Sequence, residues 1–193
     1  MNSLTETVQL LKQHKEGDKD SLDQLYGKYY QRLGAITRLK MGNHLKSNTT
    51  EEDILQSAII ESFKSIEKFE YKTEGAFLHW MGKIISNKVQ DKVGFFGAQK
   101  RNSNKLVGGS IEEYDTPSDD ETPSMVIQKN EELELLEKVI SKLPDDSKEL
   151  LIMNKIEELS YEEIAEKVDS TPEAIRKKIS RIMIKLSKDD LVV

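Results

Sequence analysis

A polar stretch near the middle of the chain separates two regions whose apolar residues recur at helical spacing. Residues 97–124 contain a Gly pair and two of the four prolines of this 193-residue chain. Six acidic residues cluster within the stretch: Glu112, Glu113, Asp115, Asp119, Asp120 and Glu121. Because so few of its side chains could join a core, we expect a flexible linker over 97–126. An ordered surface loop within one domain is the alternative, although structureless loops beyond about 15 residues are uncommon in compact domains.

The linker would divide the chain into a first module, residues 1–96, and a second module, residues 127–193. Each is near the lower size limit for a self-sufficient hydrophobic core. In the first module, one set of apolar residues recurs every three or four positions and so shares a helix face: Leu55, Ile59, Phe63 and Ile66. Thr50 and Asp53 resemble a capping box, which predicts that this helix begins near residue 51. Similar repeats mark three more helices, over 4–11, 22–36 and 77–89. We therefore expect an all-α fold with a four-helix first module.

The second module contains a pattern typical of a helix-turn-helix. Ser160 and Glu163 form a capping box, which predicts a helix over 161–168. Turn residues then lead to Pro172, a favoured first residue of a helix, and the next apolar stripe predicts a helix over 172–188. Two helices separated by so short a turn are the layout of a DNA-binding helix-turn-helix.

The second of these helices concentrates positive charge, although the whole chain has a net charge of −6. Between residues 171 and 188, Glu173 is the one acid among six basic residues: Arg176, Lys177, Lys178, Arg181, Lys185 and Lys188. On a helical wheel, Lys177 and Arg181 fall opposite the apolar stripe. Such a local reversal of charge is typical of a nucleic-acid contact face. A solvated basic helix in an ordinary bundle is the alternative.

A second candidate surface lies on the helix over 77–89. His79 and Lys83 supply positive charge beside Phe77 and Trp80, a mixture suited to stacking and phosphate neutralisation on single-stranded nucleic acid. Aromatic residues at helical spacing are more often core residues. We therefore expect Phe77 to belong to the core, whereas Trp80 fits either role.

Composition and motifs argue against several classes of function. The chain has no cysteine, which excludes disulfides, thiolate metal sites and a cysteine nucleophile. Its three histidines are isolated, and neither a phosphate-binding glycine loop nor a nucleophile motif occurs. We expect no catalytic residue, no metal and no cofactor, and hence a protein that is not an enzyme. Neither a signal peptide nor a run of about 18 apolar residues is present, so we expect a cytoplasmic protein without a membrane partner.

Together these motifs resemble the sigma-70 family of RNA polymerase sigma factors, in its small extracytoplasmic-function (ECF) form, over most of the chain. In the family's second conserved region, an acid, an apolar pair and Gln open a helix, and residues 53–56 match. The next family helix carries Phe-x-x-Trp followed by Ile and Asn, which 77–80 and 84–87 match. The fourth conserved region resembles 143–144 followed by the helix-turn-helix. The resemblance implies a region 2-like and a region 4-like module joined by the linker.

The resemblance also implies partners and site residues. The partners are core RNA polymerase and promoter DNA, and an anti-sigma factor is a further candidate. Core polymerase would contact Asp53, Gln56 and Ile60. The promoter minus-ten element would contact Phe69, Tyr71, Lys72, Trp80, Lys83 and Asn87. The minus-thirty-five element would contact Thr171, Glu173, Ala174, Arg176, Lys177 and Arg181.

The function implied is promoter-specific transcription initiation, with promoter recognition and melting. The loop 69–75 would capture a base flipped out of the minus-ten element, which favours the melted strand. Two features depart from the family pattern: Ser57 stands where Glu is frequent, and the acidic linker and the stretch 40–50 indicate a less common subgroup.

Two readings compete with this one. A conventional helix-turn-helix regulator would bind duplex DNA as a dimer without core polymerase, yet the sequence shows no leucine zipper or long apolar seam. A helical adaptor protein with a fortuitous basic helix would have no promoter activity, and charge reversal at Lys177 and Arg181 would leave it unaffected.

Overall fold

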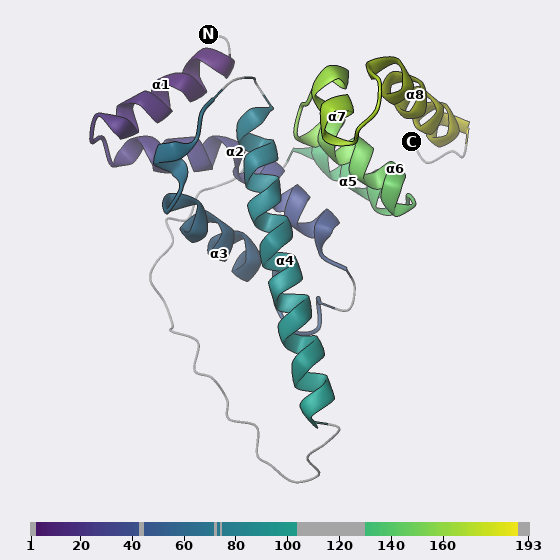
Figure 1. Ribbon diagram of the computed structural model, residues 1–193, viewed down its shortest axis with the longest axis horizontal. Helices are drawn as coiled ribbons and strands as arrows, with labels where there is room; N and C mark the ends of the chain where they lie inside the picture. The colour runs from purple at the N-terminus through teal and green to yellow at the C-terminus, as the bar shows by residue number, and fades with distance from the viewer. Residues whose placement is uncertain (1–2, 43–44, 72, 74, 104–129, 189–193) are drawn as a thin grey trace.

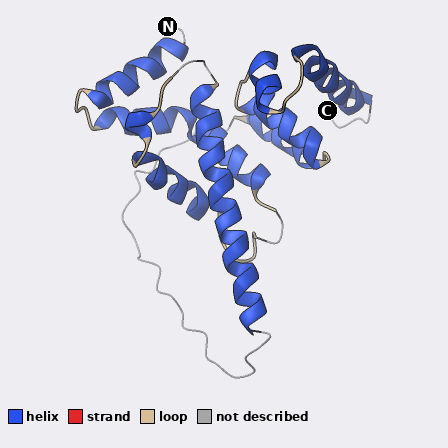
Figure 2. Cartoon of the chain, in the orientation of Figure 1, coloured by secondary structure: helices blue, strands red, loops and turns tan. Residues whose placement is uncertain are grey.

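The computed structural model describes residues 3–42, 45–71, 73, 75–103 and 130–188, and all regular structure within them is helical (Figures 1 and 2). The expected all-α fold is therefore confirmed. Lys72, and most of the segment expected as linker, lie outside the described residues.

The described residues of the first module form four α-helices and one 3₁₀ turn. These are α1 (Ser3–Lys15), α2 (Asp20–Lys40), α3 (Glu51–Phe63), η1 (Ile66–Lys68) and α4 (Ala76–Ser103). Helix α2 packs against α1, α3 and α4, and α3 packs against α4 (Figure 1). Helix α4 includes residues 97–103, the first part of the segment expected as linker, because Ala98, Gln99 and Lys100 favour continuation of a helix.

An aromatic cluster fills the core where α4 begins. Phe77 is fully buried, as expected, and its ring lies 5.1 Å from that of Tyr29 and 5.9 Å from that of Tyr26. Phe69 and Trp80 complete the cluster at 6.0 and 5.9 Å from Phe77. Because Phe69 comes just after η1, these contacts fix the loop that connects η1 to α4.

The expected capping box at the start of α3 is present, and Phe63 at the end of the helix lies at the margin of its buried face. The hydroxyl of Thr50 accepts a hydrogen bond from the Asp53 N–H at 3.1 Å, and α3 begins at Glu51. Phe63 is 45% exposed, and its ring makes an edge-on contact with the buried ring of Tyr26. At 100° per residue, eight positions rotate Phe63 about 80° away from Leu55, to the margin of the buried face.

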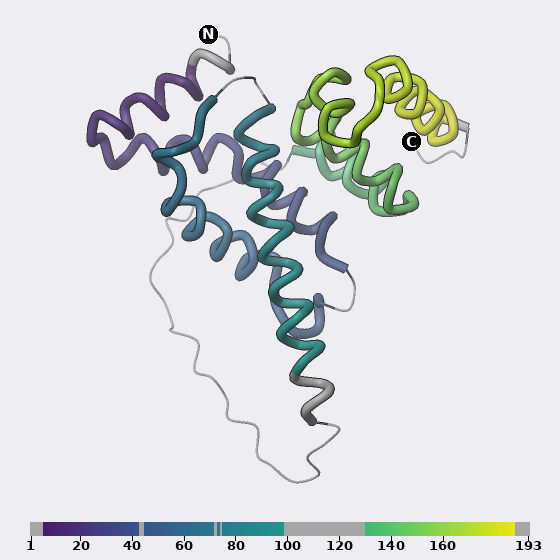
Figure 3. Tube along the Cα trace, viewed as in Figure 1, coloured from purple at the N-terminus to yellow at the C-terminus, as the bar shows by residue number. Residues whose placement is uncertain are grey.

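The second module contains α5 (Glu131–Ser141), α6 (Asp145–Leu151), a π-helical turn η2 (Ile152–Ile156), α7 (Tyr161–Lys167) and α8 (Pro172–Lys188). Helices α7 and α8 form the helix-turn-helix at the expected positions, and they pack against each other. Ser160 accepts a hydrogen bond from the Glu163 N–H at 3.2 Å, which completes the expected capping box. Helix α2 lies against α5 and η2, so the two modules are in contact (Figure 3).

Candidate nucleic-acid and protein interfaces

The residues predicted to contact polymerase form an exposed stripe along α3. Asp53, Gln56 and Ile60 follow one another at spacings of three and four, and all three are exposed. Ile60 is 56% exposed, and Phe63, three positions further, continues the stripe. Phe63 was not predicted for this surface, although its spacing from Ile60 was a usable signal. A stripe that combines polar and apolar side chains suits a protein partner.

Asp53 also has a structural task at the start of α3. Its carboxylate accepts hydrogen bonds from the Thr50 N–H at 3.0 Å and from the Thr49 hydroxyl at 3.5 Å. Hydrogen bonding by the side chain and backbone of Thr50 holds the pKa of Asp53 below its ordinary value. Asp53 therefore caps α3 as well as facing solvent.

The residues predicted for the minus-ten element comprise an aromatic cluster and a polar extension along α4. The rings of Phe69 and Trp80 lie 4.8 Å apart at 30°, and the ring of Tyr71 lies 6.4 Å from Phe69. All three side chains are half-buried against the core. Lys83 and Asn87 are exposed and follow Trp80 at spacings of three and four. The aromatic edges and the polar extension thus share one side of α4.

The residues predicted for the minus-thirty-five element surround the start of α8. Thr171 caps the helix through its hydroxyl, which accepts a hydrogen bond from the Ala174 N–H at 3.3 Å. Ala174 is half-buried, whereas the other members of the set are exposed: Thr171, Glu173, Arg176, Lys177 and Arg181. Helix α8 is held by Ile175 and Ile179 on its opposite, buried face.

The cations of α8 lie together and are open to an anionic partner. Arg176, Lys177, Ser180 and Arg181 border a shallow hollow of about 210 Å³. Within the described part of the chain, none of these three cations forms an ion pair. The arrangement can therefore neutralise DNA phosphates without first breaking an internal contact.

Ion pairs between the two modules were not predicted. All of them have the same arrangement of charge. In each pair the first module supplies the cation and the second module supplies the carboxylate. The pairs are Arg32 with Glu158 at 2.5 Å, Lys40 with Glu149 at 3.0 Å, and Arg38 with Glu137 at 2.7 Å. In addition, a hydrogen bond of 2.6 Å joins His79 Nδ1 to the Glu157 carboxylate. His79, which was predicted to lie among the nucleic-acid-facing cations, instead faces the second module. Sequence periodicity carries no signal for such pairs.

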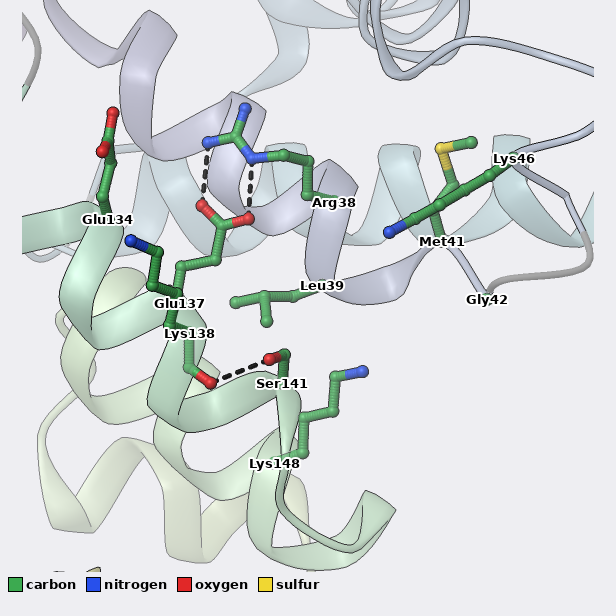
Figure 4. A pocket seen from close by; sticks show the side chains of 10 residues that line it. All are labelled: Arg38, Leu39, Met41, Gly42, Lys46, Glu134, Glu137, Lys138, Ser141 and Lys148. Carbon is green, nitrogen blue, oxygen red and sulfur yellow. Dashed lines mark hydrogen bonds and ion pairs between the residues drawn. The ribbon is translucent and has the colours of Figure 1, made fainter. Parts of the chain in front are cut away.

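Arg38 forms the most elaborate of these contacts. Its Nε and Nη2 donate to the two carboxylate oxygens of Glu137 at 2.7 and 2.9 Å (Figure 4). Its Nη1 donates to Glu51 at 2.7 Å. Hydrogen bonding to Glu137 raises the pKa of Arg38. Burial lowers this pKa, and the hydrogen bond to Glu51 raises it further. Beside this pair, Lys46, Lys138 and other residues line a hollow of about 540 Å³ between the two modules.

The described residues hold no cluster of His, Asp and Glu suited to a metal ion. Among the described helices, none is both long and apolar enough to cross a membrane.

Comparison with known proteins places this geometry among sigma factors. A family model described as ECF sigma factor matches residues 4–190. The ECF RNA polymerase sigma-E factor of Haemophilus influenzae is 28% identical over 176 residues, covering 89% of this chain and 88% of that protein. The RNA polymerase sigma-H factor of Pseudomonas aeruginosa is 26% identical, covering 90% of this chain and 88% of that protein.

Solved structures share the fold. CnrH, solved in complex with the cytosolic domain of CnrY, aligns with a TM-score of 0.52 and 19% identity, over 93% of each chain. The sigma factor RpoE of Bartonella quintana, solved with the anti-sigma factor NepR, aligns with a TM-score of 0.52 and 18% identity. That alignment covers 88% of this chain and 96% of the other.

Proposed function

Because the chain belongs to the ECF sigma factor family, it is a sigma factor that directs transcription initiation by core RNA polymerase, and we propose how its surfaces divide that work. The observation that carries the assignment is the family match over residues 4–190. The three exposed surfaces on α3, α4 and α8 supply a separate place for each step.

The α3 stripe is the proposed contact with core polymerase. Gln56 and Ile60 have the exposure that a partner needs, and Phe63 adds apolar area to the same stripe. Burying an apolar side chain against a partner contributes about 25 cal/mol per Å². Ile60 and Phe63 would therefore supply affinity, while Asp53 and Gln56 would set the orientation of the polymerase on the stripe.

The aromatic cluster at the start of α4 is the proposed site for the minus-ten element. Phe69, Tyr71 and Trp80 offer ring edges and faces on which an unstacked base can rest, and each such contact is worth about 1–3 kcal/mol. Lys72 belongs to the same proposed set by its place in the loop. Lys83 and Asn87 would guide the backbone of the melted strand along α4.

The exposed face of α8 is the proposed reader of the minus-thirty-five element. Thr171, Glu173 and Ala174 lie at the helix N-terminus, the end of a recognition helix that meets base edges in this motif. Arg176, Lys177 and Arg181 would hold phosphates or guanine edges. We propose two modules, the first extended from residue 96 to the end of α4 at Ser103 and the second beginning near residue 127.

Sigma factors are not an enzyme family, and we assign the chain binding and DNA opening without chemistry of its own. Its work with core polymerase would take place in the cytoplasm. Because the RpoE structure of the same fold contains the anti-sigma factor NepR, and CnrH was likewise solved with a protein partner, an anti-sigma factor is a proposed partner here too.

The test is a pull-down with purified core polymerase followed by run-off transcription on genomic fragments. We compare the wild type with a Gln56→Ala, Ile60→Asp double variant. The matched control is Gln24→Ala, Val8→Asp, which changes an exposed polar and an exposed apolar residue outside the proposed sites. The α3 variant should lose core binding and defined transcripts, and the control should keep both.

Two results would contradict the proposal. A wild-type protein that ignores core polymerase yet shifts duplex DNA alone would be a conventional helix-turn-helix regulator. Equal loss of binding in both double variants would mean that general instability, rather than the α3 stripe, is responsible.

A further inference from the structure

The hollow beside Arg38 is rich in lysine (Figure 4). Lys46 reaches it from the turn after α2, Lys138 from α5 and Lys148 from α6. We call the space that these three side chains line the lysine hollow. Its volume of about 540 Å³ is within the range that is usual for small-molecule sites. Because three separate elements each contribute one lysine, it is the fold that brings these charges together.

The three lysines have no internal counter-ion. Within the part of the chain that the structure describes, none of them forms an ion pair. Carboxylates are not scarce in this chain, whose net charge is −6. The cations of α2 that contact the second module, Arg32, Arg38 and Lys40, each have a carboxylate partner. The lysine hollow therefore differs from the rest of the boundary between the modules in holding positive charge that is not neutralised.

Two carboxylates also line the hollow, but one of them is already engaged. Glu137 accepts two hydrogen bonds from Arg38, whose remaining Nη1 donates to Glu51. This pair forms a wall of the hollow and does not offset the lysines. Glu134 is exposed and is the other carboxylate. Three ammonium groups against one carboxylate leave an excess of two positive charges, which attracts a dianion.

The lysines approach the hollow from different sides. In Figure 4 the ammonium groups of Lys46 and Lys148 face the same open space, one from each module, while Lys138 lies beyond Glu137. The buried Leu39 lies between these two groups in this view. The hollow thus offers positive charge at two places with an apolar side chain between them.

Phosphate groups suit this arrangement. A phosphate monoester carries about −1.5 to −2 charges at pH 7 and has three strong acceptor oxygens. A lysine ammonium group has three donors and is a common binder of phosphate. Because the positive charge lies at two places, a ligand with two phosphate groups on a small organic framework contacts more of the lysines than one inorganic phosphate does.

We propose that the lysine hollow binds a small organic molecule that carries two phosphate groups. A nucleoside diphosphate and a sugar bisphosphate share this chemistry. Duplex DNA suits the exposed cations of α8 better, because a hollow of about 540 Å³ is too narrow to admit a double helix. The proposed site goes beyond the sigma function and does not depend on it.

The test is isothermal titration calorimetry of the full chain with guanosine diphosphate (GDP) and, separately, with fructose bisphosphate. Magnesium is left out because it would neutralise the phosphates. The Lys46→Gln, Lys148→Gln double variant removes one lysine of the hollow from each module. Its matched control, Lys19→Gln, Lys155→Gln, removes the same charge from exposed positions outside the hollow, again one in each module.

The wild type and the matched control should bind at least one of the two ligands with equal affinity. Loss of a hydrogen bond to a charged group costs about tenfold in affinity, so the double variant should bind about a hundredfold more weakly. Added salt should weaken binding by the wild type, because it screens the lysines.

A variant that gains affinity guards against a folding defect in the double variant. Glu134→Gln removes the exposed carboxylate of the hollow, whereas Glu132→Gln removes the same charge from an exposed position of α5 that does not line it. Glu134→Gln should tighten binding about twofold, the size expected for one exposed charge. Glu132→Gln should bind as the wild type does.

Binding of GDP alone would identify a nucleotide as the ligand class, and binding of fructose bisphosphate alone would identify a phosphorylated sugar. Either result supports the proposal. It is overturned if neither ligand binds, if inorganic phosphate binds as tightly as both, or if the double variant and its matched control bind equally well. Duplex DNA that binds with the same dependence on Lys46 and Lys148, while neither small ligand binds, would make the hollow a DNA contact instead.

Discussion

Replacement of Asp53 by Ala should destabilise the first module, whatever it does to polymerase binding. The substitution removes the 3.0 Å hydrogen bond from the Thr50 N–H and the weaker one from Thr49. It also removes a negative charge from the first turn of α3, where the helix dipole favours one. Loss of a capping interaction costs about 1 kcal/mol. For a module of this size that corresponds to about 5 °C in Tm.

The pH dependence of this effect has a definite sign. The pKa of Asp53 is lowered in the folded protein, so the folded state favours the carboxylate form. Its contribution is therefore present above the pKa of the unfolded chain and is lost as the pH falls through the lower, folded pKa. The difference in Tm between wild type and Asp53→Ala should be largest near neutral pH and should shrink between about pH 5 and pH 2.

Thermal unfolding followed by circular dichroism measures this difference, with Glu52→Ala as the control. Glu52 is exposed in the same first turn of α3, and no hydrogen bond to the Thr50 backbone depends on it. The reasoning is refuted if the two variants lower the Tm by the same amount, or if the Tm difference between wild type and Asp53→Ala persists at low pH. The expected outcome also explains why Gln56 and Ile60 are cleaner probes of the polymerase stripe.

Two further predictions separate folding from DNA recognition. Phe77→Ala removes a fully buried ring from the aromatic cluster and should lower the free energy of unfolding, measured by urea titration, by about 3–5 kcal/mol. Lys83 is exposed, so Lys83→Ala should leave the urea midpoint unchanged and weaken binding of a single-stranded minus-ten oligonucleotide. If Lys177 and Arg181 each neutralise one phosphate, Lys177→Ala and Arg181→Ala should each reduce the slope of log affinity against log salt by about 0.9. Fluorescence anisotropy with minus-thirty-five duplex measures this slope. An unchanged slope would mean that α8 does not contact the DNA backbone.

Local signals in the sequence predicted the helices well because each signal acts over a few residues. The capping boxes at Thr50 and Ser160 satisfy backbone donors at once, so α3 and α7 begin where expected. Pro172 is compatible only with the first turn of α8, which fixes that boundary as well. The exposure of Phe63 was not predicted, because its helical spacing from Leu55 and Ile59 does not show that it lies at the margin of the buried face.

The contact between the modules could not be predicted from the sequence, for a different physical reason. From the sequence alone, Gly82 is only a weak helix former, and Glu157 is expected to be an ordinary surface acid. Their roles depend on an approach between residues 75 positions apart in the chain, which periodicity cannot encode. His79 was grouped with Lys83 because both supply positive charge beside Phe77 and Trp80. In the structure Lys83 faces solvent, whereas His79 contacts Glu157.

The polarity of the inter-module ion pairs bears on DNA binding, because the first module supplies the cations. The carboxylates of Glu137, Glu149 and Glu158 pair with cations of α2, so those cations are not available to phosphates. A ligand shifts such an equilibrium only by its difference in affinity for the two states. DNA phosphates that bind these cations would therefore have to offset the free energy of the ion pairs with the carboxylates. Added salt, which screens exposed ion pairs, should weaken the contacts between the modules as well as the phosphate contacts of α8.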